Sequence, residues 1–167
     1  MDGIAKRAGV AKGTVYLYYA SKDEILQQIL EEDLALLHED TVPQVSEAGA
    51  LDARLTRFLA AALTFFDRKR DFFEQAHFEM SPDVRRKALQ KLETVYKAQL
   101  DAWSDAIIAA QGEGLVANTI DARACASTIV ALAGGLGRQR LRGWIAGPVE
   151  TVAGQASAAL WHGMVAR

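Results

Sequence analysis

Apolar residues recur three or four positions apart along most of the chain, which is the spacing of one face of an α-helix. One such stripe between residues 22 and 42 consists of Ile25, Leu26, Ile29, Leu30, Leu34 and Leu37. A second stripe between residues 51 and 70 consists of Leu55, Phe58, Leu59, Ala62, Phe65 and Phe66. No segment shows a convincing alternation typical of strands. The pattern therefore predicts an all-α fold.

Capping residues predict where several of these helices begin. Ser21 and Glu24 form a capping box, in which Ser21 accepts from the Glu24 amide and Glu24 reaches back to the Ser21 amide. Ser81-Pro82-Asp83 starts a long helix that continues to Gln111. Asp121 caps a helix that reaches about Gly143. These signals divide the second half of the chain into long helices.

Prolines and glycines predict the remaining boundaries. Pro43 is expected to end the helix that starts near Ser21, leaving 43–50 as a connector. A shorter aromatic helix is expected over 71–80. Gly147-Pro148 opens a last helix that runs through Val165. We therefore expect two parts, a head over residues 1–42 and a helical body over residues 43–167.

Composition is consistent with a helical protein of this size. Half of the 167 residues are hydrophobic, and three prolines interrupt the chain. No apolar run is long enough to cross a membrane, and the charged N-terminus does not resemble a signal peptide. The one cysteine, Cys125, has no partner for an internal disulfide and is interpreted as a small buried residue. These features favour a cytoplasmic protein.

Charge is unevenly distributed although the net charge is only −2. Residues 1–22 carry Lys6, Arg7, Lys12 and Lys22 against the single acid Asp2. Residues 23–40 carry seven acids and no lysine or arginine. A basic head of this kind suits contact with phosphates, although a solvated charged face gives the same pattern.

The first 24 residues have the pattern of a helix-turn-helix. Ala5 and Ala8 are small enough for two helices to cross closely, and Gly9 permits the sharp turn between them. Val10 and Val15 are expected to fill the shared core. The second helix then presents its remaining side chains outward, as a recognition helix does.

This segment resembles the DNA-binding signature of the TetR family in residue type and spacing together. The matching residues are Ala8-Gly9-Val10, Gly13-Thr14-Val15-Tyr16, Tyr18-Tyr19 and Ser21-Lys22-Asp23-Glu24. The rest of the chain is similar to the family in architecture. The resemblance implies an all-α fold with an N-terminal helix-turn-helix head and a helical body for ligand binding and dimerisation.

The resemblance also implies which residues meet double-stranded DNA. Lys12, Gly13 and Thr14 begin the recognition helix, where base edges and nearby phosphates are contacted. Tyr16 and Tyr18 are expected on the DNA backbone, and Leu17 on bases or sugars. Lys22 is expected to clamp a phosphate at a helix N-terminus, whereas Tyr19 is expected in the core.

One departure from the family concerns the start of the head. Family members have a further helix before the segment that begins near Gly3, so the resemblance implies a head without its first helix. Asp2 would also face DNA, where an acid repels phosphate. The alternative is therefore a helical small-molecule-binding dimer that has lost DNA binding through truncation.

In the family, the helices corresponding to residues 51–111 surround a cavity for a small inducer. The residues predicted to line it are Phe58, Phe65, Phe66, Phe73, His77, Phe78, Tyr96, Gln99 and Trp103. Aromatic walls with a few polar groups are usual for such cavities. The same rings would serve equally well as the core of a helical bundle.

By the same resemblance, the last two helices of two copies form a four-helix homodimer interface that matches a palindromic operator. The residues expected near it are Ile129, Leu132, Leu136, Val152, Leu160, Trp161 and Met164. Packing inside one chain is the alternative for each. Arg138, Arg140 and Arg142 form a basic cluster that is expected to be solvated, with recognition of an acidic ligand as the alternative.

Nothing in the sequence favours an enzyme. The three histidines are far apart and lack metal-ligand spacing, and no phosphate-binding glycine loop is present. We expect no catalytic residues, no metal and no cofactor. The function implied is a ligand-responsive DNA-binding transcriptional regulator, a repressor released from its operator by a small-molecule inducer.

Overall fold

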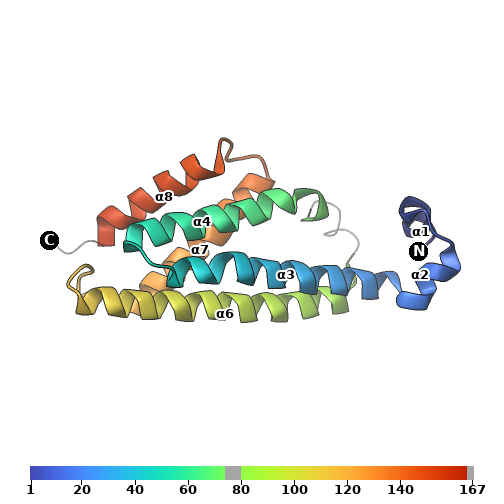
Figure 1. The fold of residues 1–167 in the computed structure, drawn as a ribbon, viewed down its shortest axis with the longest axis horizontal. Coiled ribbons are helices and arrows are strands. Elements are labelled where there is room, and N and C mark those ends of the chain that lie inside the picture. The colour runs from blue at the N-terminus through green and yellow to red at the C-terminus, as the bar shows by residue number, and fades with distance from the viewer. Residues whose placement is uncertain (74–79, 165–167) are drawn as a thin grey trace.

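The computed structural model describes residues 1–73 and 80–164, and the helix numbering follows Figure 1. The helices are α1 (Asp2–Ala8), α2 (Lys12–Tyr18), α3 (Lys22–Ser46), α4 (Leu51–Arg68), α6 (Pro82–Gly112), α7 (Ala122–Leu141) and α8 (Val149–Met164). The described residues contain no strand of a β-sheet, so the all-α prediction is confirmed. The predicted helix over 71–80 lies largely outside the described residues, although 71–73 are helical.

Two long helices, α3 and α6, lie side by side along the molecule, and α1 and α2 stand at the outer end of α3 (Figure 1). Helix α4 packs against α3 on one side and against α7 and α8 on the other, while α7 also packs against α6. The body is therefore a bundle built around α4. The head is joined to it through α3.

The predicted helix starts at Ser81 and Asp121 are confirmed. The Ser81 hydroxyl accepts a hydrogen bond from the amide of Val84, and the Asp121 carboxylate accepts one from the amide of Ala124. Each bond satisfies an amide that the first helical turn leaves without an intrahelical partner. Local sequence signals thus determine where α6 and α7 begin.

The prediction that Pro43 ends its helix is wrong, because α3 continues through Pro43 to Ser46. Proline removes one backbone donor and crowds the preceding turn. Here the final turn is held by packing, since Val45 is almost completely buried in the core. Arg54 also donates to the carbonyl of Val45, and the amide of Glu47 donates to the carbonyl of Pro43. Tertiary contacts therefore outweigh the local cost of the proline.

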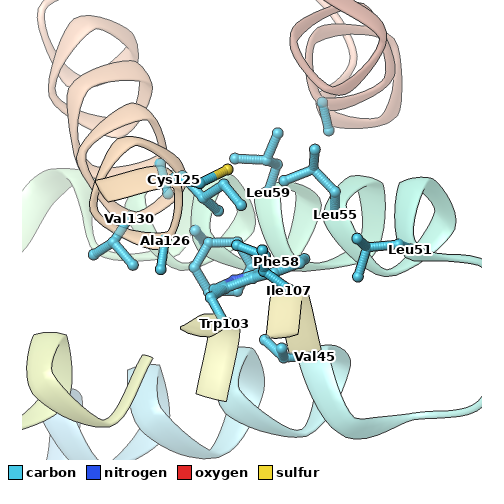
Figure 2. Packing of buried hydrophobic residues seen from close by; sticks show 14 of the residues in the cluster. Val45, Leu51, Leu55, Phe58, Leu59, Trp103, Ile107, Cys125, Ala126 and Val130 are labelled. Carbon is cyan, nitrogen blue, oxygen red and sulfur yellow. The ribbon is translucent and has the colours of Figure 1, made fainter. Parts of the chain in front are cut away.

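The core of the body is formed where α4, α6 and α7 meet. Phe58 and Trp103 are fully buried and pack edge to face, with ring centroids 5.5 Å apart. Figure 2 shows these rings beside Ile107, with Ala126 of α7 and Val45 of α3 nearby. Cys125 is buried in the same cluster, as expected, and burial raises the pKa of its thiol. The apolar stripe of α4 thus faces inward.

The expectation that Arg140 is solvated is wrong. Arg140 is buried and donates from Nε and Nη2 to the two carboxylate oxygens of Asp67, at 3.0 and 2.5 Å. Asp67 also pairs with Arg70, which donates to the carbonyls of Arg140 and Leu141. Arg138 is exposed. Polar contacts therefore join the end of α4 to the end of α7.

Candidate functional site

The head is a small helix pair that closes around two buried side chains. Ala5 of α1 is 3% exposed and Val15 of α2 is 8% exposed. Gly9, which ends α1, has a left-handed backbone with φ of +68°, a conformation that favours glycine. The predicted helix-turn-helix geometry is confirmed in these respects. Val10, in contrast, is 42% exposed, so its predicted burial is wrong.

Helix α2 presents an unusually apolar surface to solvent. Leu17 is 83% exposed and Tyr18 is 74% exposed, and Tyr16 is also exposed. Lys12, Gly13 and Thr14 are exposed at the start of the same helix. Large side chains left in water on one short helix indicate a contact surface. All six of these predicted DNA-contact residues therefore lie on the accessible part of α2, whereas Tyr19 is half-buried.

Lys12 has a partner in the head itself. Its Nζ lies 2.7 Å from a carboxylate oxygen of Asp2 and 6.0 Å from the centre of the Tyr16 ring. The hydrogen bond to Lys12 lowers the pKa of Asp2, and the same bond raises the pKa of Lys12. Both groups are thus charged at neutral pH. Any contact of Lys12 with an anion competes with Asp2.

The start of α3 differs in one detail from the predicted capping box. The Ser21 hydroxyl accepts from the Glu24 amide at 3.1 Å, as predicted. The Glu24 carboxylate, however, accepts from the amide of Ala20 at 2.6 Å rather than from that of Ser21. The bond shifts by one residue because the extended backbone at Ser21 leaves the Ala20 amide within reach. Lys22 is half-buried in the first turn of α3, close to the positive end of the helix.

The predicted pocket residues fall into three places in the body. Phe58 and Trp103 lie in the core, and Gln99 is also buried. Phe65, Phe66 and Phe73 form a separate ring cluster, in which Phe65 packs edge to face on both other rings. Tyr96 lines a groove between α6 and α7. His77 and Phe78 lie outside the described residues.

Gln99 provides a buried polar link between α6 and α3. Its Nε2 donates to the hydroxyl oxygen of Thr41 at 2.8 Å, and Thr41 donates to the carbonyl of Leu37 at 2.6 Å. Both side chains are almost fully buried, at 3% and 0% exposed. A buried hydrogen bond of this kind is costly to break, so the two helices are coupled at this point. Sequence reasoning identified Gln99 but not its partner.

The groove beside Tyr96 has a volume of about 530 Å³. The α6 wall consists of Glu93, Tyr96, Lys97 and Leu100. The α7 wall consists of Ser127, Val130, Ala131, Gly134 and Arg138. The predicted pocket includes Tyr96 alone among these residues, and Arg138 belongs to the basic cluster considered for an acidic ligand; the other lining residues are mostly short or charged and gave no signal in the sequence. The other described residues of the predicted pocket do not line this groove.

The residues predicted for the dimer interface lie on α7 and α8 and differ in exposure. Ile129 is completely buried in the core of its own chain. Leu132, Leu136, Val152, Leu160 and Trp161 are half-buried and pack against that core. The side chain of Met164 lies outside the described part. The half-buried residues keep some apolar surface accessible for a partner.

Two further findings concern other classes of protein. Among the described residues, histidine, cysteine and acidic side chains do not form a cluster that could hold a metal ion. None of the described helices combines the length and apolar character needed to span a membrane.

Comparison with known proteins connects the head to a family. Residues 1–29 match the sequence profile of "Bacterial regulatory proteins, tetR family". No protein of curated function matches the chain in sequence.

Several solved structures share the fold. The fatty acid degradation regulator FadR from Bacillus halodurans has a TM-score of 0.72 and 20% identity, over 98% of this chain and 84% of that chain. The TetR family transcriptional regulator PfmR from Thermus thermophilus has a TM-score of 0.70 and 21% identity, over 95% and 85%. AibR, solved with isovaleryl coenzyme A and operator DNA, has a TM-score of 0.66 and 17% identity, over 95% and 85%. Residues 1–29 are thus similar in sequence to the tetR family of bacterial regulatory proteins, and the chain as a whole shares the all-helical fold of these solved structures.

Proposed function

We propose that the chain is a ligand-responsive repressor that binds a palindromic operator as a homodimer and leaves it when a small-molecule inducer binds the body. The observation that carries the proposal is the exposed face of α2. Leu17, Tyr16 and Tyr18 stand in water next to Lys12 and Thr14, on a helix held by Gly9 and Val15. Such a helix suits the major groove, which accepts an α-helix and offers base edges and thymine methyl groups.

The individual contacts follow from side-chain chemistry. Lys12 and Thr14, at the start of α2, reach base edges and nearby phosphates, and Leu17 makes apolar contacts with bases or sugars. The hydroxyls of Tyr16 and Tyr18 donate to phosphates. Lys22 adds a phosphate contact that the N-terminus of α3 supports.

Homodimerisation would occur through α7 and α8. The half-buried apolar residues on these helices, among them Leu132, Leu136 and Trp161, retain surface that a second copy can cover. Two-fold symmetry then places two heads about one helical turn apart on DNA, roughly 34 Å between half-sites. A regulator that acts on chromosomal DNA in this way works in the cytoplasm and needs binding rather than catalysis.

Control by a ligand requires that the ligand prefers one arrangement of the heads over the other. The body, residues 43–167, contains a groove against α6, and the buried Gln99–Thr41 bond couples α6 to α3. A ligand that displaces α6 would therefore change the direction of α3 and the spacing of the heads. AibR, which shares the fold, was solved with both isovaleryl coenzyme A and operator DNA.

The test is fluorescence anisotropy of the protein with a labelled duplex from upstream of its own gene, at two salt concentrations. A scrambled duplex of the same composition serves as the control. We expect binding that prefers the upstream duplex and weakens steeply with salt, since phosphate contacts release counterions. Equal affinity for both duplexes would contradict the proposal that the protein recognises a specific operator sequence. Absence of binding to either would favour a small-molecule-binding dimer without DNA-binding activity.

A further inference from the structure

The groove between α6 and α7 has cationic side chains on both of its walls. Lys97 lies on the α6 wall and Arg138 on the α7 wall. Within the part of the chain that the structure describes, neither residue takes part in an ion pair. Glu93 is the one carboxylate among the lining residues, so the groove carries a net positive charge. Cations without a protein partner on facing walls are available for an anion.

A glycine lets two hydrogen-bond donors come together in this groove. A Cβ at Gly134 would lie 3.2 Å from Nη1 of Arg138 and 3.3 Å from the hydroxyl of Tyr96. The guanidinium group and the phenol, from different helices, therefore approach the same stretch of α7. A side chain at position 134 would crowd both of them. The small residue keeps this end of the groove open and rich in donors.

The remaining lining residues give the groove an apolar side. Leu100 is half-buried on α6, and Val130, on α7, belongs to the hydrophobic core of the body. Ala131 adds a short apolar surface next to them. The volume of about 530 Å³ falls within the range of roughly 300–1,000 Å³ typical of sites for small molecules. A molecule bound in the groove thus contacts cationic groups and hydrogen-bond donors at one end and apolar side chains elsewhere.

We propose that this groove binds a small organic anion with an apolar body, whose acidic group lies between Lys97, Arg138 and the Tyr96 hydroxyl. The inference rests on the proposed function, because it names the chemical class of the inducer. It also assigns a site distinct from the aromatic core around Phe58 and Trp103. These two rings pack directly on each other.

The position of the groove on α6 relates it to the head. Tyr96 and Leu100 line the groove, while Gln99, between them in sequence, is bonded to Thr41 of α3. One short stretch of α6 thus faces the groove on one side and α3 on the other. An anion that draws Lys97 toward Arg138 would act on the segment that holds α3.

Two fluorescent probes separate the roles of charge and apolar surface. The anionic probe is 8-anilino-1-naphthalenesulfonate, and the neutral probe is N-phenyl-1-naphthylamine, which lacks the sulfonate. Both are titrated into the wild-type protein and into the double variant Lys97→Gln/Arg138→Gln. The control variant, Lys91→Gln/Arg142→Gln, removes the same charge from exposed positions outside the groove.

We expect saturable binding of the anionic probe, with a dissociation constant about tenfold higher in the Lys97→Gln/Arg138→Gln variant because charge-assisted contacts are lost. The neutral probe should change by less than about twofold, and the control variant should resemble the wild type with both probes. Gly134→Ala should also weaken the anionic probe, whereas Gly135→Ala, which has open space around it, should not. The proposal is overturned if the wild type shows no saturable binding, or if the double variant weakens both probes equally or neither.

The same proteins are then tested for binding to the upstream duplex. If DNA binding is absent while the probe results are as expected, the anion site stands and the proposed regulator function falls. If duplex binding is selective while the anionic probe is insensitive to the double variant, the function stands and the anion site falls. The two proposals therefore fail in different experiments.

Discussion

The ring of Phe66 on α4 lies directly against the backbone of Gly137 on α7. A Cβ at position 137 would lie 2.0 Å from Cδ2 of Phe66 and 2.2 Å from its Cε2, which is far inside van der Waals contact. Helices α4 and α7 can approach this closely only because residue 137 has no side chain. The contact lies within one chain.

Gly137→Ala should therefore lower the free energy of unfolding by about 2 kcal/mol, since overpacking displaces a ring that its neighbours hold. The measurement is urea denaturation followed by circular dichroism. Gly135→Ala is the matched control on the same helix, with open space around the added methyl group. The control should be unchanged or up to about 1 kcal/mol more stable, because alanine favours helices over glycine. Equal stability of the two variants would contradict the contact.

Asp67→Asn should destabilise the body by about 2 kcal/mol at neutral pH, because it leaves the buried Arg140 guanidinium without its charged partner. Hydrogen bonds from Arg140 hold the pKa of Asp67 below its ordinary value of 3.8 in the folded protein. The carboxylate therefore contributes stability above that value and loses it as the pH falls through the lower folded pKa. Urea denaturation at pH 7 and at pH 3 measures the difference.

At pH 3 the gap between the wild type and Asp67→Asn should be smaller than at pH 7. Asp105→Asn, at an exposed position on α6, controls for the loss of one negative charge. If the difference in the free energy of unfolding between the wild type and Asp67→Asn is the same at both pH values, the negative charge of Asp67 does not stabilise its contact with Arg140.

The sequence predicted the helices well where their ends depend on nearby residues. The side chains of Ser81 and Asp121 accept hydrogen bonds from backbone amides three residues later, where α6 and α7 begin. The left-handed backbone of Gly9 ends α1. Signals of this kind involve only neighbouring residues, so they can be recognised from the sequence without knowledge of the rest of the fold. Pro43 is the exception, because burial of Val45 keeps the last turn of α3 helical, and that burial depends on other helices.

The sequence could not predict pairings between residues far apart in the chain. Asp67 and Arg140 are separated by 73 positions, and Gln99 and Thr41 by 58. The contacts inside the head were easier to predict, since its core residues Ala5 and Val15 are close to each other in the sequence. The groove was not predicted, because its lining residues come together only when α6 and α7 lie next to each other.

Asp2→Asn should strengthen DNA binding by up to about fivefold, the scale of an exposed ion pair. The Asp2 carboxylate holds Lys12 and is itself charged at neutral pH, because the hydrogen bond to Lys12 lowers its pKa. Removing the charge frees Lys12 for DNA and removes repulsion of phosphate. Anisotropy titrations with the upstream duplex measure the change, and Asp2→Glu, which keeps the charge, is the control. Weaker binding by Asp2→Asn would refute the competition.

Lys22→Ala should weaken binding to the upstream and scrambled duplexes alike and lower the slope of log K against log salt by about 0.9, since one phosphate contact is lost. Lys91→Ala, at an exposed position on α6 outside the head, should leave the slope unchanged. The measurement is anisotropy over a series of salt concentrations. An unaltered slope for Lys22→Ala would rule out its assignment as a phosphate contact.

Helix α3 belongs to the head at one end and to the bundle at the other, and its 25 residues form one uninterrupted rod. At about 1.5 Å per residue, that rod is a lever roughly 37 Å long. A tilt of about 5° near Thr41 would carry the outer end, about 28 Å away, through about 2.5 Å. This displacement approaches the roughly 3.4 Å of DNA helix axis that corresponds to one phosphate of each strand. A small tilt of α3, which side chains in the core can accommodate, thus moves the head by a distance comparable to the spacing of base pairs along DNA.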